Sequence, residues 1–155
     1  MVTLKEGDKA PEFSGPDQDG NTISSKDYKG KTLVLYFYSE AGSPTCTLES
    51  CNLRDNYGAL KKKGLEVLGV SPDKTTAQKK FADKYKLPFP LIADVDNRIS
   101  LAYGVWDHKK LFGHEYMGIL RTTFIIDDKG RIKKIFLKPK NKMHGEEILK
   151  AVTNE

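Results

Sequence analysis

The alternation of apolar and polar stretches along the chain predicts an α/β protein. Residues 32–38 and 65–70 are uninterrupted apolar runs, which are typical of central strands buried on both faces. Each run is followed by a segment with helix start and stop signals, the first at about 44–63 and the second at about 71–86. This order of strand, helix and strand indicates a right-handed parallel crossover.

Shorter elements complete the pattern. The stretch 106–118 is polar, contains glycine and has no periodicity, so we interpret it as a loop. Together, the predicted elements form a strand–helix–strand half that is joined through a helix to a strand–strand–helix half. The predicted fold class is therefore α/β and thioredoxin-like, with a central mixed β-sheet flanked by helices and an N-terminal β-hairpin. The remaining predicted elements are a turn at 17–20, strands at 21–24 and 91–93, a helix at 98–103, a hairpin of 122–127 with 131–137, and a helix at 145–152.

Length and composition narrow the class of protein. A chain of 155 residues without repeats or linkers predicts a single domain over residues 1–155. Its content of 38% hydrophobic and 10% aromatic residues excludes a disordered protein. No apolar stretch is long enough to span a membrane, and residues 1–8 lack the apolar core of an export signal. We therefore expect a cytoplasmic protein.

The positive charge is concentrated in one segment near the C-terminus. Residues 129–142 hold seven lysines and arginines and no acidic residue, and without these seven the net charge changes from +5 to −2. A basic strand of this kind can attract nucleic acid. Because no nucleic-acid motif accompanies it, we favour a solvated hairpin and expect neither a nucleic-acid nor a membrane partner.

The two cysteines, Cys46 and Cys51, are the candidates for chemistry. Two thiols in a cytosolic protein indicate redox chemistry, a metal site or plain packing. Ser43 is a good N-cap and Pro44 a good first helical residue, so Cys46 is predicted in the first turn of a helix. There the free backbone N–H groups and the helix dipole favour a thiolate over a thiol. The predicted position therefore favours a nucleophilic cysteine over an inert one.

Helical geometry separates the two thiols. Ser50, Leu53, Tyr57 and Leu60 lie within about 40° of Cys46 around the helix, which places Cys46 on the core-facing stripe. Cys51 lies about 140° away from Cys46. In an intact helix their Cα atoms are about 8.7 Å apart, whereas a disulfide needs about 4.4–6.8 Å. If these thiols pair, the first turns must unwind, and a shortened helix could then begin at a residue such as Asn52.

Six segments of the chain resemble the peroxiredoxins, and within them the Q type, or bacterioferritin comigratory protein subfamily. They occur in family order over nearly the whole chain, so the resemblance is specific. The segments are GDKAPEF at 7–13, LYFY at 35–38, CTLESCNLRD at 46–55, LGVSPD at 68–73, YGVW at 103–106 and GILRTTFIID at 118–127.

The resemblance implies a thiol-dependent peroxidase that reduces hydrogen peroxide and organic hydroperoxides. Cys46 matches the peroxidatic cysteine, which becomes a sulfenic acid, and Cys51 matches a resolving cysteine that forms an intramolecular disulfide with it. Arg121 matches the active-site arginine, and the Ser43 hydroxyl stands where the family has threonine. The resemblance further implies recycling by thioredoxin or a similar dithiol, no cofactor and a monomer.

Two further positions depart from the family pattern. Ser39 occupies the place of a proline that shields the cysteine from water and from further oxidation, and Thr45 replaces a glycine. We therefore expect Cys46 to be less shielded than in the family. The nucleophile, a hydroxyl and the arginine all remain, so the expected type of reaction is unchanged.

Other candidate residues have ordinary structural interpretations. Arg54 is expected to be an ion-pair partner of Asp55 or Glu49, and no metal is expected because the spacing of the cysteines and of the first two histidines falls at or beyond the edge of ligand spacing. Two aromatic side chains could line a peroxide pocket but are more typical of core packing. The third histidine is expected at the surface. The aromatics are Tyr36 and Trp106, and the histidines are His108, His114 and His144.

Two alternatives to a peroxidase remain open at this point. One is a thiol–disulfide exchange protein with little peroxidase activity, which would normally carry a Cys-x-x-Cys motif that this sequence lacks. The other is a basic binding module in which both cysteines are inert. Consumption of peroxide at a catalytic rate separates the peroxidase from the exchange protein, and slow alkylation of both thiols would indicate the binding module.

Overall fold

A five-stranded mixed sheet forms the centre of the computed structural model, which describes residues 2–153. The strand order is β5-β4-β3-β8-β9; β3, β4 and β5 run parallel, and β8 is antiparallel to both of its neighbours. This arrangement confirms the predicted fold class. The strands are β3 (Thr32–Phe37), β4 (Leu65–Ser71), β5 (Leu91–Ala93), β8 (Thr122–Ile126) and β9 (Ile132–Phe136).

The sheet separates two hydrophobic cores, and β3 contributes to both of them. Successive side chains of a strand point to opposite faces. Val34 and Tyr36 therefore enter the core on one face, and Leu35 and Phe37 enter the core on the other. All four side chains are fully or almost fully buried. This explains the uninterrupted apolar run, because a strand covered on both faces has no polar side.

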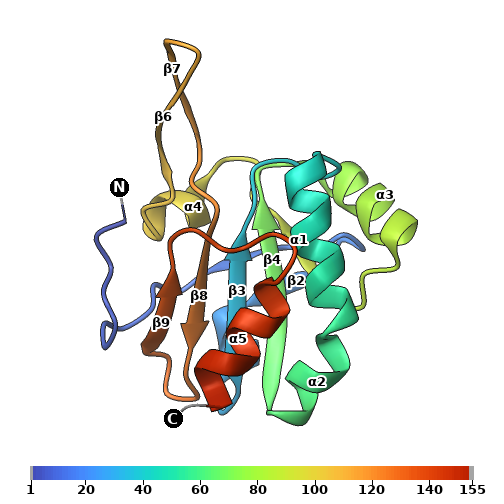
Figure 1. The fold of residues 1–155 in the computed structure, drawn as a ribbon, viewed down its shortest axis with the longest axis vertical. Coiled ribbons are helices and arrows are strands. Elements are labelled where there is room, and N and C mark those ends of the chain that lie inside the picture. The colour runs from blue at the N-terminus through green and yellow to red at the C-terminus, as the bar shows by residue number, and fades with distance from the viewer. Residues whose placement is uncertain (1, 154–155) are drawn as a thin grey trace.

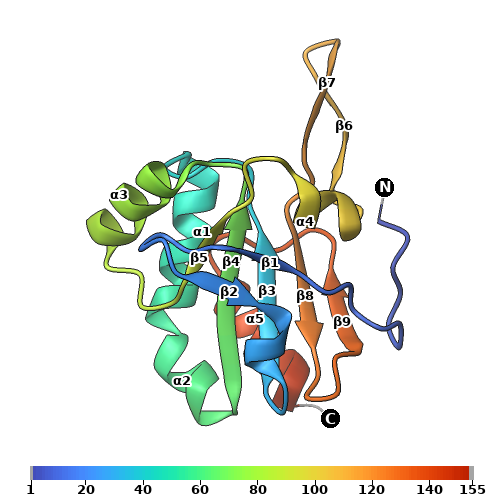
Figure 2. The same ribbon diagram turned by 180° about the vertical axis from the view of Figure 1, so that it is seen from behind.

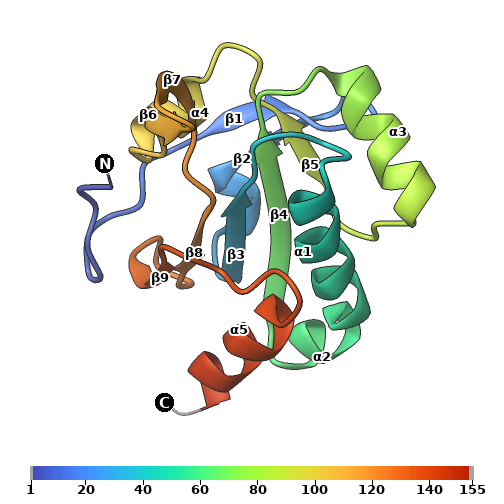
Figure 3. The ribbon, with the colours of Figure 1, turned by 45° about the horizontal axis from the view of Figure 1, so that its top comes forward.

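Helices cover one face of the sheet, and the N-terminal hairpin covers the other (Figures 1 and 2). Viewed with the top of the molecule turned forward, α1 and α3 lie on one side of the sheet, and β1 and α4 lie on the other (Figure 3). On the first face are α1 (Pro44–Asp55), α2 (Tyr57–Lys62), α3 (Thr75–Tyr85) and α5 (His144–Thr153). On the second are β1 (Ser14–Pro16), β2 (Thr22–Ser24), the 3-10 helix η1 (Ser25–Tyr28) and α4 (Arg98–Ala102).

The N-terminal hairpin forms as predicted. β1 pairs antiparallel with β2, and the Asp17 side chain closes the turn by accepting hydrogen bonds from the backbone N–H groups of Asp19 and Asn21, both at 2.9 Å. Within residues 2–153, no helix is long and apolar enough to cross a membrane.

The helix predicted at about 44–63 is two helices, because the chain breaks at Asn56. The Asn56 side chain donates a hydrogen bond to the Asn52 carbonyl at 2.9 Å and another to the Glu146 carboxylate at 3.3 Å. Local bonding of this kind competes with regular helix geometry. The close approach of α5 at Gly145 holds Asn56 in this position, since a β-carbon at Gly145 would lie only 2.6 Å from Asn56.

The prediction of a loop at 106–118 is wrong. This stretch is a two-stranded antiparallel ribbon of β6 (Trp106–Leu111) and β7 (His114–Ile119), which projects from the top of the molecule (Figure 1). Phe112 and Gly113 connect the strands with positive φ angles of 50° and 80°, as tight hairpin turns require. Most of the ribbon is exposed on both faces, so its sequence shows no alternation of apolar and polar residues.

Candidate active site

Cys46 lies in the first turn of α1, just beyond the carboxyl end of the central strand β3. Ser43 is the N-cap of α1, and its hydroxyl accepts a hydrogen bond from the Cys46 backbone N–H at 3.4 Å. Pro44 is the first helical residue, as predicted. The Cys46 side chain packs in the helix-side core and is fully buried. Ser43 thus fixes where the helix begins and holds Cys46 at its N-terminal end.

Ser39 contacts the Cys46 sulfur directly. The distance from Ser39 Oγ to Cys46 Sγ is 3.5 Å, within hydrogen-bonding range for sulfur. The Cys46 side chain that carries this contact is 0% exposed. A serine at this position supplies a hydroxyl to the thiol, which a proline ring cannot do.

Asp73 holds the loop that leads into α1. Its carboxylate accepts hydrogen bonds from the Ala41 backbone N–H at 2.7 Å and from the Ser71 hydroxyl at 2.6 Å. Ala41 lies between Ser39 and Ser43, the two residues whose hydroxyls bond to Cys46. The loop after β4 therefore supports the position of both hydroxyls.

Arg121 immediately precedes β8 and points toward the cysteine helix. Its Nη1 lies 4.0 Å from Oε1 of Glu49, and the same nitrogen donates a hydrogen bond to the Asn141 side-chain oxygen. The Arg121 side chain is only 22% exposed. Glu49 lies three residues after Cys46, on the same face of α1. Arg121 is therefore close to the turn that follows Cys46.

Glu49 lies in the candidate site although no sequence motif singles it out for chemistry. Its side chain is fully buried, and within the described residues neither carboxylate oxygen has a hydrogen-bond partner. Burial raises the pKa of Glu49 to about 7, although the nearby cation of Arg121 opposes part of this rise. Its spacing of three residues from Cys46 places it on the same face of the helix, which is a signal that the sequence does contain. The sequence predicts it only as a possible ion-pair partner of Arg54, which pairs with Asp55 instead.

Cys51 lies five residues after Cys46 and is half-buried, and both thiols are free. Burial raises the pKa of the Cys51 thiol, while Arg54 partly opposes the rise. The next residue, Asn52, bonds to the beginning of α5. Cys51 therefore lies where the cysteine helix meets the C-terminal helix.

The remaining candidates divide between confirmed and wrong expectations. Arg54 is a structural ion-pair partner as expected, with its Nε 2.9 Å from Asp55. Tyr36 belongs to the core, where its hydroxyl bonds to Ser50 Oγ at 2.9 Å. The surface position expected for His144 is wrong, because it is fully buried and its ring bonds to Thr123 Oγ1 at 2.7 Å.

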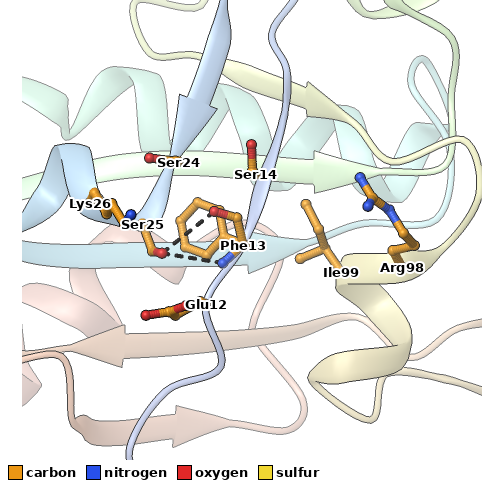
Figure 4. A pocket seen from close by; sticks show the side chains of 8 residues that line it. All are labelled: Glu12, Phe13, Ser14, Ser24, Ser25, Lys26, Arg98 and Ile99. Carbon is orange, nitrogen blue, oxygen red and sulfur yellow. Dashed lines mark hydrogen bonds between the residues drawn. The ribbon is translucent and has the colours of Figure 1, made fainter.

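The ribbon of β6 and β7, which carries two of the histidines, and a cavity beside η1 both lie away from the cysteines. His108 and His114 are exposed on β6 and β7, and Trp106 packs against the second core at the base of this ribbon. A cavity of about 420 Å³ lies between η1 and α4 on the face of the sheet opposite α1. Figure 4 shows the side chains that line it. Its lining contains no cysteine, so it is not the site of thiol chemistry. The lining residues are Glu12, Phe13, Ser14, Ser24, Ser25, Lys26, Arg98 and Ile99.

The raised pKa of Glu49 predicts how stability depends on pH. As pH rises from 4.5 to about 7, the unfolded chain loses the Glu49 proton while the folded chain keeps it, so the folded state loses stability. Once Glu49 is ionised in both states, the unfolding free energy has fallen by roughly 3 kcal/mol. Relative to the Glu49→Gln variant, we expect the unfolding free energy of the reduced protein to fall by about 2–3 kcal/mol between pH 5 and pH 8.

Urea unfolding at several pH values measures this difference. His144, whose pKa is lowered by burial, titrates in both proteins, so its contribution cancels in the comparison. Glu115→Gln, on the exposed ribbon, keeps Glu49 and is the matched control, so relative to Glu49→Gln it should show the same fall as the wild type. A difference between the wild type and Glu49→Gln that stays constant across the pH range would contradict the prediction.

Fold and site together define the class of protein. A thioredoxin-like sheet that presents a capped, buried cysteine at the end of its central strand, with an arginine beside the next helical turn, is the arrangement of a peroxiredoxin, a thiol-dependent peroxidase. The AhpC/TSA family model matches residues 6–135, and the chain belongs to this family.

Known relatives cover almost the whole chain. Peroxiredoxin Bcp of Escherichia coli (strain K12) is 43% identical over 149 residues, which are 96% of each chain. Peroxiredoxin Bcp of Bacillus subtilis (strain 168) is 42% identical over 151 residues, which are 97% of this chain and 96% of the relative. Among solved structures, Xylella fastidiosa PrxQ has a TM-score of 0.92 at 26% identity. The match covers 99% of this chain and 98% of the PrxQ chain. The chain is therefore a peroxidase oxidoreductase with the peroxiredoxin fold.

Proposed function

We propose that Cys46 is the peroxidatic cysteine. The Cys46 thiolate attacks one oxygen of the hydroperoxide, the O–O bond breaks, and the other oxygen leaves as water or an alcohol after taking up a proton. Cys46 becomes a sulfenic acid. The observation that carries this proposal is the position of Cys46 at the capped start of α1, with the Ser39 hydroxyl on its sulfur and Arg121 beside the next turn.

Ser43 and Arg121 are proposed to assist this step. The Ser43 hydroxyl bonds to the Cys46 backbone in the free protein and is available to bond to the thiolate or peroxide in the reacting complex. The Arg121 guanidinium supplies a permanent positive charge for the thiolate and for the negative charge that develops on the peroxide oxygens.

Cys51 is proposed as the resolving cysteine. Its thiol attacks the sulfur of the Cys46 sulfenic acid, a disulfide forms, and water leaves. A dithiol reductant such as thioredoxin then takes up the disulfide through thiol–disulfide exchange and restores both thiols. The presence of Cys51 on the same helix, half-buried and free, supports this assignment.

The proposed substrates are hydrogen peroxide and organic hydroperoxides. A solved structure with a TM-score of 0.88 and 26% identity is described by its alkyl peroxide reduction activity, which supports the organic class. We further propose that the chain acts as a single-domain monomer in the cytoplasm, where thiols are kept reduced. Peroxide consumption by the reduced protein, followed by stopped flow, tests the proposed activity against a thiol–disulfide exchange protein, which would not consume peroxide at a catalytic rate.

The disulfide step predicts a local loss of helix. In an intact helix the two Cα atoms are about 8.7 Å apart, too far for a disulfide, so α1 has to unwind between Cys46 and Cys51. The apolar loss is small because Leu48, the large apolar residue of the segment, is already 44% exposed. Unwinding also releases Glu49 from a buried position in which its carboxylate has no hydrogen bond.

We therefore expect amides at 43–55 to exchange faster in the disulfide form than in the reduced form. Hydrogen–deuterium exchange of both forms measures this change, and the Cys51→Ser protein, which cannot form the disulfide, is the control. Equal protection of this segment in a protein with a confirmed intramolecular disulfide would contradict the prediction.

A further inference from the structure

The segment that joins β9 to α5, residues 137–143, contacts the proposed active site. We call it the strap. In Figure 1 it crosses in front of the sheet from β9 to the side of α1. Its residue Asn141 accepts a hydrogen bond from Nη1 of Arg121. Among the described residues, Glu49 is the ion-pair partner of Arg121. Its carboxylate lies 4.0 Å from the same nitrogen, which is beyond hydrogen-bonding distance, so it does not replace the contact with Asn141. Asn141 is thus the described side chain that directly fixes the guanidinium.

The strap is in turn fastened to the cysteine helix by one side chain. Asn52 Nδ2 donates to the Lys142 carbonyl at 2.9 Å, and Asn52 Oδ1 accepts from the Gly145 backbone N–H at 2.7 Å. The second bond satisfies a free N–H in the first turn of α5. A further bond inside this region runs from the Lys140 backbone N–H to Glu147 at 2.7 Å.

Asn52 directly follows Cys51, so disulfide formation acts on the residue that fastens the strap. When α1 unwinds through Cys51, the remaining helix starts near Asn52 and its first N–H groups lose their carbonyl partners. Asn is a favourable N-cap, and Asn52 is one residue at which the shortened helix could begin. In the reduced protein, however, the same side chain is already engaged with Lys142 and Gly145. Capping the shortened α1 would use Oδ1 of Asn52, the atom that accepts from Gly145 in the reduced protein, so the new N–H groups compete with α5 for this oxygen.

We propose that Asn141 is a positioning residue for Arg121, and that Asn52 withdraws this support when the Cys46–Cys51 disulfide forms. The proposal rests on the proposed roles of the two cysteines and Arg121. In the reduced protein, Asn52 holds the strap and Asn141 holds the guanidinium in place for the peroxide. In the disulfide form, the strap and the first turn of α5 loosen together with α1. The C-terminal helix therefore takes part in the redox cycle without contributing a reacting atom.

Kinetics of the reduced protein test the positioning role. We expect Asn141→Ala to slow the reaction of Cys46 with hydrogen peroxide about fivefold to tenfold, and to change alkylation by iodoacetamide less than about twofold. Asn141→Gln keeps a neutral amide oxygen and should lose less of the rate than Asn141→Ala. Lys142→Ala is the matched control in the strap, because its side chain is exposed. The double variant Asn141→Ala with Arg121→Lys should be no slower than Arg121→Lys alone, since both changes remove the same interaction.

The outcomes separate this inference from the proposed function. If Arg121→Lys is slow while Asn141→Ala reacts at the wild-type rate, the positioning role of Asn141 is overturned. If Arg121→Lys also reacts at the wild-type rate, the role of Arg121 itself fails. Loss of alkylation together with loss of the peroxide reaction in Asn141→Ala would show a general disturbance of the fold and would also overturn the positioning role.

Hydrogen–deuterium exchange tests the redox link. The reporters are the strap and α5 amides with defined partners, those of Lys140, Met143, Gly145 and Glu147. We expect their exchange to increase at least about tenfold in the disulfide form. In Asn52→Ala, exchange should already be fast in the reduced protein, and oxidation should add little. If the Gly145 amide of the wild-type protein is equally protected in the reduced and disulfide forms, the redox link is overturned.

Discussion

Replacing Cys46 by serine is expected to abolish peroxide reduction. A serine hydroxyl is far too weakly acidic to be ionised at neutral pH, so the nucleophile is lost although Ser43 and Arg121 remain in place. Peroxide consumption in the presence of a dithiol reductant measures the effect, and no consumption by Cys46→Ser should be detectable. Because Cys46 is buried and serine is slightly smaller, the fold should survive the change.

Cys51→Ser is the matched control for this experiment. It should still react once with peroxide, leaving a sulfenic acid on Cys46 that a sulfenic-acid trapping reagent captures and mass spectrometry detects. Turnover should then depend on whether the reductant reaches Cys46 directly. Full peroxidase activity in Cys46→Ser would refute the assignment of the nucleophile, whatever the behaviour of Cys51→Ser.

Arg121→Lys is expected to slow the peroxide step at least about tenfold, although the charge is retained. The planar guanidinium reaches Asn141 and faces Glu49 with the same nitrogen, while its other donors are available to the reacting oxygens. A lysine ammonium is a single point of charge with a different reach, so it cannot reproduce this fork of donors. Stopped-flow measurement of the reaction with hydrogen peroxide gives the rate.

Arg54→Lys is the control, because Arg54 lies on the same helix but pairs with Asp55 and the Tyr85 carbonyl instead. Its peroxide rate should stay near that of the wild type. An Arg121→Lys protein with an unchanged rate, and an unchanged profile of iodoacetamide reactivity with pH, would show that Arg121 does not act at the thiol.

Features that depend on neighbouring residues in the chain could be predicted from the sequence. The apolar run of β3, the cap at Ser43 and the proline at the first helical position are local signals, and together they place Cys46 at the start of a helix. Helical phase likewise separates the buried Cys46 from the half-buried Cys51. These signals suffice because each concerns residues only a few positions apart.

The hairpin of β6 and β7 shows where such signals fail. A ribbon that is exposed on both sides buries no face, so its side chains carry no alternation that could reveal a strand. Its turn was also hidden, because Phe112 adopts a positive φ that aromatic residues rarely take. Similarly, His144 looks like a surface residue by composition, and only the packing of α5 against β8 buries it beside Thr123.

The sequence by itself determined the central sheet, the helix start at Ser43 and the separation of the two thiols, because capping, periodicity and chain geometry act over short distances. The tertiary structure alone decided which distant groups meet beside the turn of α1 that follows Cys46. Glu49, Arg121 and Asn141 meet because α1, β8 and the strap converge at one end of the sheet. Burial then leaves the Glu49 carboxyl without a hydrogen bond and raises its pKa. Partnerships of this kind arise from the packing of distant segments, so no local pattern in the chain encodes them.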